Sequence, residues 1–172
     1  MNTFDCIKAR HSCRKFLPKM VEKEKLQKVV EAGLLAPTGV NSQKVHILMI
    51  TNKEIRDELS RLNAKIMGRE GIDPFYGAPA VALVYVDSSA HTAVYDGSLC
   101  LGYMLLEAAE LGLGNIWIHR GKEELESEEG KAILKKLGID GDYIGIGHCC
   151  LGYEDGEPTI REKDLTRVNY AE

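Results

Sequence analysis

The chain has 172 residues, 44% of them hydrophobic and 28% charged, which is ordinary for a globular protein with a sizeable core. Its net charge of -4 gives no overall attraction to nucleic acid or to an anionic membrane surface, so we expect neither partner. The sequence has no run of about 18 apolar residues that would predict a membrane-spanning helix, and its N-terminus lacks the apolar centre of a signal peptide. These features predict one domain over residues 1–172, in the cytoplasm.

Two helices joined by an extended link are predicted in the first forty residues. Thr3 is expected to cap a short helix that runs toward Arg10, because its hydroxyl can accept a hydrogen bond from the first turn. A second helix is predicted over 21–35, where apolar residues recur on one face. Pro37 and Gly39 then end that helix.

The remaining chain alternates predicted strands and helices. Strands are expected at 45–50, 80–86, 115–118 and 143–151; the first should be buried, and the second should be central. Helices are expected at 53–66, capped by Asn52, at 91–111, and at 123–137, ended by Gly138. Residues 67–79 predict a loop, and the last twenty residues predict extended chain. This order predicts an α+β or α/β domain of three layers.

The helix expected over 91–111 is unusual because it is hydrophobic nearly all round. A surface helix normally has one apolar stripe and an opposite polar face. We therefore expect this helix to be buried in the core or at a subunit interface.

A basic cluster follows the first predicted helix, in the stretch RHSCRKF at residues 10–16. A solvated basic patch is the plain interpretation of such a cluster. The functional interpretation is an anion site, since Arg10 and Arg14 can each make bidentate contacts to a phosphate or a ring carbonyl. His11 and Ser12 add an imidazole and a hydroxyl to the same stretch.

Residues 36–43 (APTGVNSQ) place a Pro-Thr-Gly turn before two carboxamides, Asn41 and Gln43. A turn capped by Asn41 is compatible with binding, because carboxamides offer both donors and acceptors to a polar ring. Fixed positive charge together with planar amides suits a flat anion with a phosphate tail. Flavin mononucleotide (FMN) has that shape.

Two further segments are candidates for the same site. His119, Arg120 and Gly121 follow the third predicted strand, where loops commonly carry function, although the pattern favours a structural histidine over a cofactor or substrate contact. Arg161 and Lys163 lie in the polar tail, where they either reach a phosphate or remain solvated. The histidines and cysteines lack metal-ligand spacing, so no metal is expected.

Taken in order, several motifs make the chain resemble the nitroreductase family of FMN-dependent oxidoreductases. Each motif is weak alone, but their order and spacing are specific. The resemblance implies an α+β fold, a three-layer α-β-α sandwich, in an intertwined homodimer that binds FMN at the subunit interface. The motifs are Arg10-His11-Ser12-x-Arg14, Ala36-Pro37-Thr38-x-x-Asn41-x-Gln43, Tyr76-Gly77-Ala78-Pro79, Asp96-Gly97-Ser98-Leu99, and Gly147-x-x-x-Leu151-Gly152-Tyr153.

By position, the resemblance implies that the N-terminal cluster contacts the flavin phosphate, ribityl chain and ring edge, and that the tail adds a second phosphate contact. It also implies that Pro37, Thr38 and Asn41 are supplied by the other subunit. We take residues 119–121 as the candidate for the contact to flavin N5. The complete set of candidate cofactor-binding residues is Arg10, His11, Ser12, Arg14, Pro37, Thr38, Gly39, Asn41, Gln43, His119, Arg120, Gly121, Arg161 and Lys163.

No catalytic side chain is expected, because the flavin carries the chemistry and the protein positions it. The resemblance implies a ping-pong reaction in which NADH or NADPH reduces the flavin and a small organic oxidant, such as a nitroaromatic or a quinone, reoxidises it. The alternative is a non-catalytic flavin-binding or redox-sensing protein of the same fold. A flavin-free anion-binding domain is a further alternative.

Overall fold

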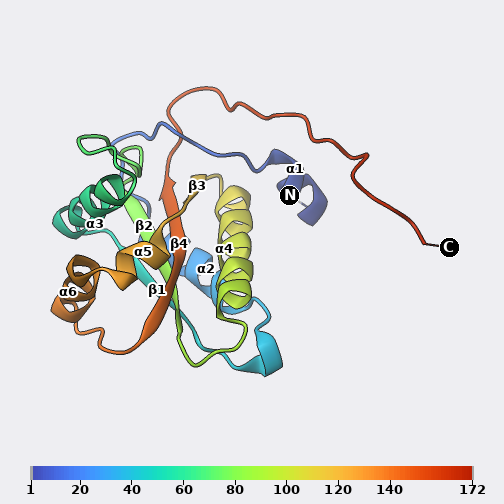
Figure 1. The fold of residues 1–172 in the computed structure, drawn as a ribbon. Helices are drawn as coiled ribbons and strands as arrows, with labels where there is room; N and C mark the ends of the chain where they lie inside the picture. Colours follow the sequence, from blue (N-terminus) through green and yellow to red (C-terminus); the bar gives the residue numbers. More distant parts are fainter. Residues whose placement is uncertain (1, 172) are drawn as a thin grey trace.

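The computed structural model of the chain describes residues 2–171 and contains a four-stranded sheet between two layers of helices (Figure 1). In chain order, the elements are α1 (Thr3–Ala9), α2 (Lys23–Leu34), the 3-10 turn η1 (Gly39–Asn41), β1 (Val45–Ile50), α3 (Lys53–Ile66), β2 (Ala80–Asp87), α4 (Ala93–Glu110), β3 (Gly114–Ile118), α5 (Gly121–Glu126), α6 (Glu128–Lys136) and β4 (Tyr143–Gly152).

All neighbouring strands of the sheet are antiparallel, in the order β1-β2-β4-β3. This decides between the two expected fold classes in favour of α+β, because an α/β domain is built on a mostly parallel sheet. β2 is buried from Ala80 to Val86, as expected for a central strand. The prediction of a buried strand at 45–50 is wrong: β1 has the predicted ends, but it lies at the sheet edge and His46 is exposed.

Helices cover both faces of the sheet, so the predicted three-layer α-β-α arrangement is confirmed. α2 and α4 pack together on one face, while α3, α5 and α6 form the layer on the other (Figure 1). The larger hydrophobic core lies under α2 and α4, where Val29, Met104 and Ala108 are fully buried beside Val84 of β2. No helix within residues 2–171 is long and apolar enough to cross a membrane.

α4 buries one face and exposes another. Cys100, Met104 and Ala108 point into the core, whereas a row of large apolar side chains on the other face remains exposed: Val94, Tyr95, Leu99 and Tyr103. The core of the chain therefore does not account for the apolar character of this helix. An apolar surface of this kind is typical of an interaction site.

Two predictions about helix ends are corrected. Asn2, not Thr3, caps α1, because its side-chain oxygen accepts the backbone N–H of Asp5 at 3.0 Å. The single helix predicted over 123–137 is two helices, because Ser127 leaves the helical conformation and caps α6 through the N–H of Gly130.

The two ends of the chain extend away from the sheet. α1 contacts α4, and residues 157–171 run past α1 as extended chain without helix or strand (Figure 1). This agrees with the predicted extended tail. The tail exposes Leu165 and Tyr170 by 83% and 81%, so within this protomer it buries little apolar surface.

Candidate functional site

The N-terminal basic cluster lies on an extended segment held against the sheet. Cys13 is fully buried, and its N–H donates to the carbonyl of Asn115 at the start of β3, at 2.9 Å. Phe16 forms a bridge with Glu154, which follows β4. Because successive side chains of an extended segment point to opposite sides, burial of Cys13 leaves Ser12 and Arg14 facing away from the core.

The structure brings this cluster and the basic tail together. A groove of about 860 Å³ runs between α1 and residues 159–165. It is lined by six of the candidate residues: Arg10, His11, Ser12, Arg14, Arg161 and Lys163. Residues about 150 positions apart in the sequence thus form one basic surface, although their role in cofactor binding stays a prediction.

The donors in the groove suit a phosphate group. Within residues 2–171, the side chains of Arg10, Arg161 and Lys163 make no hydrogen bond or ion pair, and Arg14 donates only to the carbonyl of Ser12, at 3.3 Å. Unpaired guanidinium groups are the side chains best matched to bidentate phosphate contacts. The groove therefore fits the phosphate end of FMN.

His11 differs from its neighbours because its ring is already held. Nδ1 lies 2.9 Å from the carbonyl of Ala9, and Nε2 lies 2.7 Å from Oε2 of Glu154. These contacts fix the imidazole between the end of α1 and the segment that follows β4. They give His11 a structural task in addition to its predicted contact with a cofactor.

The predicted loop at 37–43 lies in a second place, at the N-terminal end of α4. Val40, Asn41 and Gln43 all have positive φ, between 49° and 54°, which is uncommon for residues other than glycine. Such conformations persist only where the surroundings hold them, and they often occur at functional sites. Val40 is fully exposed at the tip of the loop.

Asp96 is the anchor of this loop. Its side chain is 3% exposed, and its Oδ1 accepts the N–H of Gly39 at 3.0 Å while Oδ2 accepts the hydroxyl of Thr92 at 2.9 Å. Thr38 adds an internal bond, because its Oγ1 accepts the N–H of Gln43. Pro37, Thr38, Asn41, Gln43 and Asp96 together line a hollow of about 420 Å³.

The third predicted segment, residues 119–121, follows β3 and packs on an irregular part of β4. The pairing of β2 with β4 shifts register between Val84 and Tyr85, and β4 has glycines at 145 and 147 on either side of this shift. A Cβ on Gly145 would collide with the carbonyl oxygen of Gly121, and one on Gly121 would lie 2.6 Å from the backbone of Gly147. These glycines permit close backbone contact.

The segment borders a pocket of about 480 Å³. Trp117, His119 and Arg120 form one side of it, and residues 72–76 form another. Arg120 has a φ of 81°, and Trp117 is 52% exposed with its ring 5.7 Å from that of His119. The pocket combines aromatic rings with a cation.

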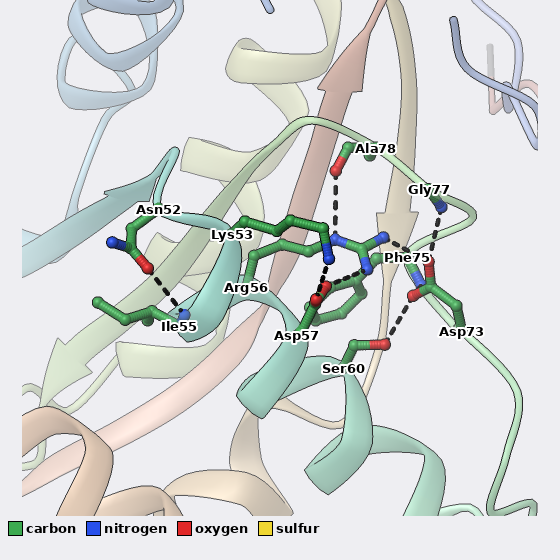
Figure 2. Close-up of polar contacts among 10 residues, drawn as sticks. All are labelled: Asn52, Lys53, Ile55, Arg56, Asp57, Ser60, Asp73, Phe75, Gly77 and Ala78. Carbon is green, nitrogen blue, oxygen red and sulfur yellow. Dashed lines mark hydrogen bonds and ion pairs between the residues drawn. The ribbon is translucent and has the colours of Figure 1, made fainter. Parts of the chain in front are cut away.

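A polar network fixes the turn on the opposite side of that pocket (Figure 2). Asp73 accepts from the hydroxyl of Ser60, from the N–H groups of Phe75 and Gly77, and from Nη2 of Arg56. Nε of Arg56 also donates to the carbonyl of Ala78, at 3.2 Å. Burial alone would raise the pKa of Asp73, but these hydrogen bonds and the Arg56 charge outweigh it and hold that pKa below its ordinary value.

The three sets of predicted residues therefore line three separate hollows in one protomer. Sequence reasoning placed Asp96 only in a family motif and did not identify it as an anchor, and it singled out neither Asp73 nor Arg56. A signal did exist for Asp96, since it is a lone acid near the start of an otherwise apolar helix. Asp73 lies in a segment that the sequence predicts as a loop. Its side-chain partners, Arg56 and Ser60, come from α3, whose charged sequence pattern is that of a surface helix.

The cysteines do not form a reactive thiol site. All five are free and buried. Burial raises the pKa of Cys13 to about 11 and that of Cys100 to about 12, and it raises the pKa of Cys149 and Cys150 as well. Since the thiolate is the reactive form, these thiols are poor nucleophiles. Within residues 2–171, no three His, Cys, Asp or Glu side chains are placed to hold a metal ion.

Comparison with known proteins identifies the family. The model of the nitroreductase family matches residues 7–153, which include the basic cluster, the 37–43 loop and the 119–121 segment. The chain belongs to the nitroreductase family. A relative from Methanothermobacter thermautotrophicus, provisionally named NADH dehydrogenase/NAD(P)H nitroreductase, is 27% identical over 94% of this chain and 82% of its own length. The NADPH-flavin oxidoreductase of Vibrio harveyi is 24% identical over 94% of this chain and 70% of its own length.

Solved structures show the same fold. A nitroreductase from Bacteroides fragilis with bound FMN superposes with a TM-score of 0.90 over 100% of both chains, at 23% identity. A nitroreductase from Desulfitobacterium hafniense with bound FMN superposes with a TM-score of 0.81 over 100% of both chains, at 27% identity. These similarities place the antiparallel sheet and its two helical layers in the nitroreductase fold.

Proposed function

We propose that this nitroreductase-family chain is an FMN-dependent oxidoreductase that uses NADH or NADPH to reduce a small organic oxidant, such as a nitroaromatic or a quinone. The observation that carries the proposal is the groove in which Arg10, Arg14, Arg161 and Lys163 converge. The names of the relatives, NAD(P)H nitroreductase and NADPH-flavin oxidoreductase, and the FMN in similar structures support the choice of cofactor and of reductant.

The phosphate of FMN would be held by Arg10, Arg14 and the two tail cations, with Ser12 as an additional donor. When bound, FMN would supply the redox chemistry of the proposed ping-pong reaction, which is hydride transfer from NADH or NADPH through N5 to the oxidant. The protein contributes positive charge and hydrogen-bond donors, which stabilise negative charge on the ring by preorganised electrostatics.

The proposed active unit is a homodimer with FMN at the subunit interface. Two observations support it: the apolar stripe of α4 is exposed, and the 37–43 loop lies in a different hollow from the phosphate groove. A second subunit would cover the stripe and could bring its own loop to the groove of its partner. We place the enzyme in the cytoplasm, where free thiols such as its five cysteines stay reduced.

A visible absorption spectrum tests the proposal. The purified protein, supplied with FMN, should show a flavin spectrum that bleaches on anaerobic addition of NADH or NADPH and returns when a quinone or nitro compound is added. Bound flavin that neither donor reduces would instead favour the flavin-binding or redox-sensing alternative. A protein that takes up no FMN would refute the proposal and leave an anion-binding domain.

A further inference from the structure

Three buried polar side chains lie directly behind the 119–121 segment. Asn63 comes from α3, Glu124 from α5 and His148 from β4, and all three are 0% exposed. None of them belongs to the predicted cofactor-binding set. Polar groups are costly to bury, so three of them together in the core call for an explanation.

Asn63 links the segment to Glu124. Its Nδ2 donates to the carbonyl of His119 at 2.9 Å and to Oε1 of Glu124 at 2.6 Å. Both neighbours are acceptors, so the amide nitrogen must face them, and this fixes the orientation of the carboxamide. One side chain thereby ties the end of β3 to the first turn of α5.

Glu124 is in turn confined by His148. Its Oε2 lies 3.0 Å from Nε2 of His148, but neither atom has hydrogen-bond geometry with any residue that the structure describes, and Nδ1 of His148 is also without a partner. The ring of His148 packs on Phe75, with 4.9 Å between the ring centres. The contact with His148, whose ring is itself held against Phe75, therefore confines the carboxylate of Glu124.

The segment that the cluster holds is itself strained. Arg120 has left-handed backbone geometry, and Gly121 touches the backbone of β4 at Gly145 and Gly147. A non-glycine residue in this region persists only when its surroundings determine its conformation. The hydrogen bond from Asn63 to the carbonyl of His119 acts on the residue just before the strained one.

We propose that Asn63, held by Glu124 and His148, is the positioning residue that fixes the backbone of residues 119–121 for its contact with the flavin ring. This rests on the proposed function and on the expectation, stated from the sequence, that residues 119–121 contact flavin N5. Asn63 does not touch the cofactor; it acts through the His119 carbonyl.

The test compares Asn63→Ala with a matched control, Asn115→Ala. Asn115 is also a buried carboxamide, 2% exposed; it lies in β3 near the opposite end from residues 119–121, and its Nδ2 donates to the carbonyl of Leu113. Glu124→Ala should behave like Asn63→Ala. Glu124→Gln keeps an oxygen for Asn63 and should retain wild-type behaviour.

Two measurements separate a local effect on the position of residues 119–121 from a general loss of stability. Amide hydrogen exchange of residues 119–122, normalised to β2, should rise about tenfold in Asn63→Ala, the factor expected when one or two hydrogen bonds are lost. In the FMN-loaded protein, the rate of flavin reduction at saturating NADH or NADPH should fall about tenfold, because misplacement near the reacting atoms is costly. The flavin absorption maximum should also shift, while FMN affinity changes less than threefold.

The proposal is overturned if Asn63→Ala matches Asn115→Ala in both readouts, or if Glu124→Gln is as impaired as Glu124→Ala. A chain that takes up no FMN would refute the proposed function instead. The exchange comparison would still decide whether Asn63 positions the segment, because it needs no flavin.

Discussion

Asp96→Ala should release the 37–43 loop while the rest of the fold remains. The side chain of Asp96 is 3% exposed and accepts hydrogen bonds from Gly39 and Thr92. Alanine removes both acceptor atoms and leaves the half-buried backbone N–H of Gly39 without this partner. Only the internal bonds of the loop, such as that from the N–H of Gln43 to Thr38, then oppose relaxation of the three positive φ angles at Val40, Asn41 and Gln43.

The magnitude follows from these two effects. Two hydrogen bonds to a buried carboxylate are worth roughly 3–6 kcal/mol in all. Relaxation of the loop recovers part of this, since left-handed non-glycine residues store on the order of 1 kcal/mol each. We expect a loss of about 2–3 kcal/mol in the free energy of unfolding. If reforming the bound loop costs about 1.4 kcal/mol, the affinity for FMN falls roughly tenfold.

Urea unfolding monitored by circular dichroism measures the free energy of unfolding, and titration of flavin fluorescence measures the affinity for FMN. Asp96→Asn is the control, because its amide oxygen can accept from Gly39 and its NH2 can donate to the Thr92 hydroxyl. This variant should retain most of the stability and most of the FMN affinity. Wild-type stability and FMN affinity in Asp96→Ala would show that the carboxylate does not hold the loop.

Other predictions concern other parts of the site. Arg14→Ala should weaken FMN binding about tenfold by fluorescence titration, because a charge-assisted contact is worth roughly 1.5–3 kcal/mol, with the unfolding midpoint unchanged; wild-type affinity would remove Arg14 from the site. Asp73→Ala should lower the free energy of unfolding by about 2 kcal/mol, a figure reduced because the carboxylate is 36% exposed. Because folding lowers the pKa of Asp73, its contribution to stability is complete above the ordinary pKa of 3.8 and is lost as the pH falls through the folded pKa. The stabilities of wild type and Asp73→Ala should therefore converge in acid unfolding experiments. In the native protein, Cys149 should not react with a thiol reagent at pH 8, since burial raises its pKa; rapid labelling would refute its assigned burial.

The local pattern of the sequence predicted most elements of the fold. β1 and α3 have the predicted ends, because the turn residues Pro37 and Gly39 precede β1 and the capping residue Asn52 precedes α3. The break at Ser127 was missed because it depends on a local cap and a close contact: the N–H of Gly130 donates to Ser127, and a Cβ on Gly130 would collide with the carbonyl of Glu124. Periodicity alone does not reveal such a contact, and it equally gave no sign that β1 would lie at an edge.

The basic groove could be anticipated in part, because the charges of residues 10–14 are close in sequence. Its completion by Arg161 and Lys163 came from the family resemblance, since no local pattern joins segments so far apart. The supports of the site could not be anticipated at all. Asn63 lies within a charged helix, and only the packing of α3 against α5 turns it toward Glu124.

The arrangement of α4 connects the proposed dimer to the proposed cofactor site. The same helix carries an exposed apolar stripe, which includes Tyr95 and Leu99, and the buried Asp96 that anchors the 37–43 loop. A partner that covers the stripe must therefore also lie beside the loop. Because the loop and the phosphate groove lie in different hollows of one protomer, association is the step that would bring a loop to a groove. Burial of the stripe and assembly of the flavin site would then be one event, which explains why a single protomer shows both an apolar surface and a divided site.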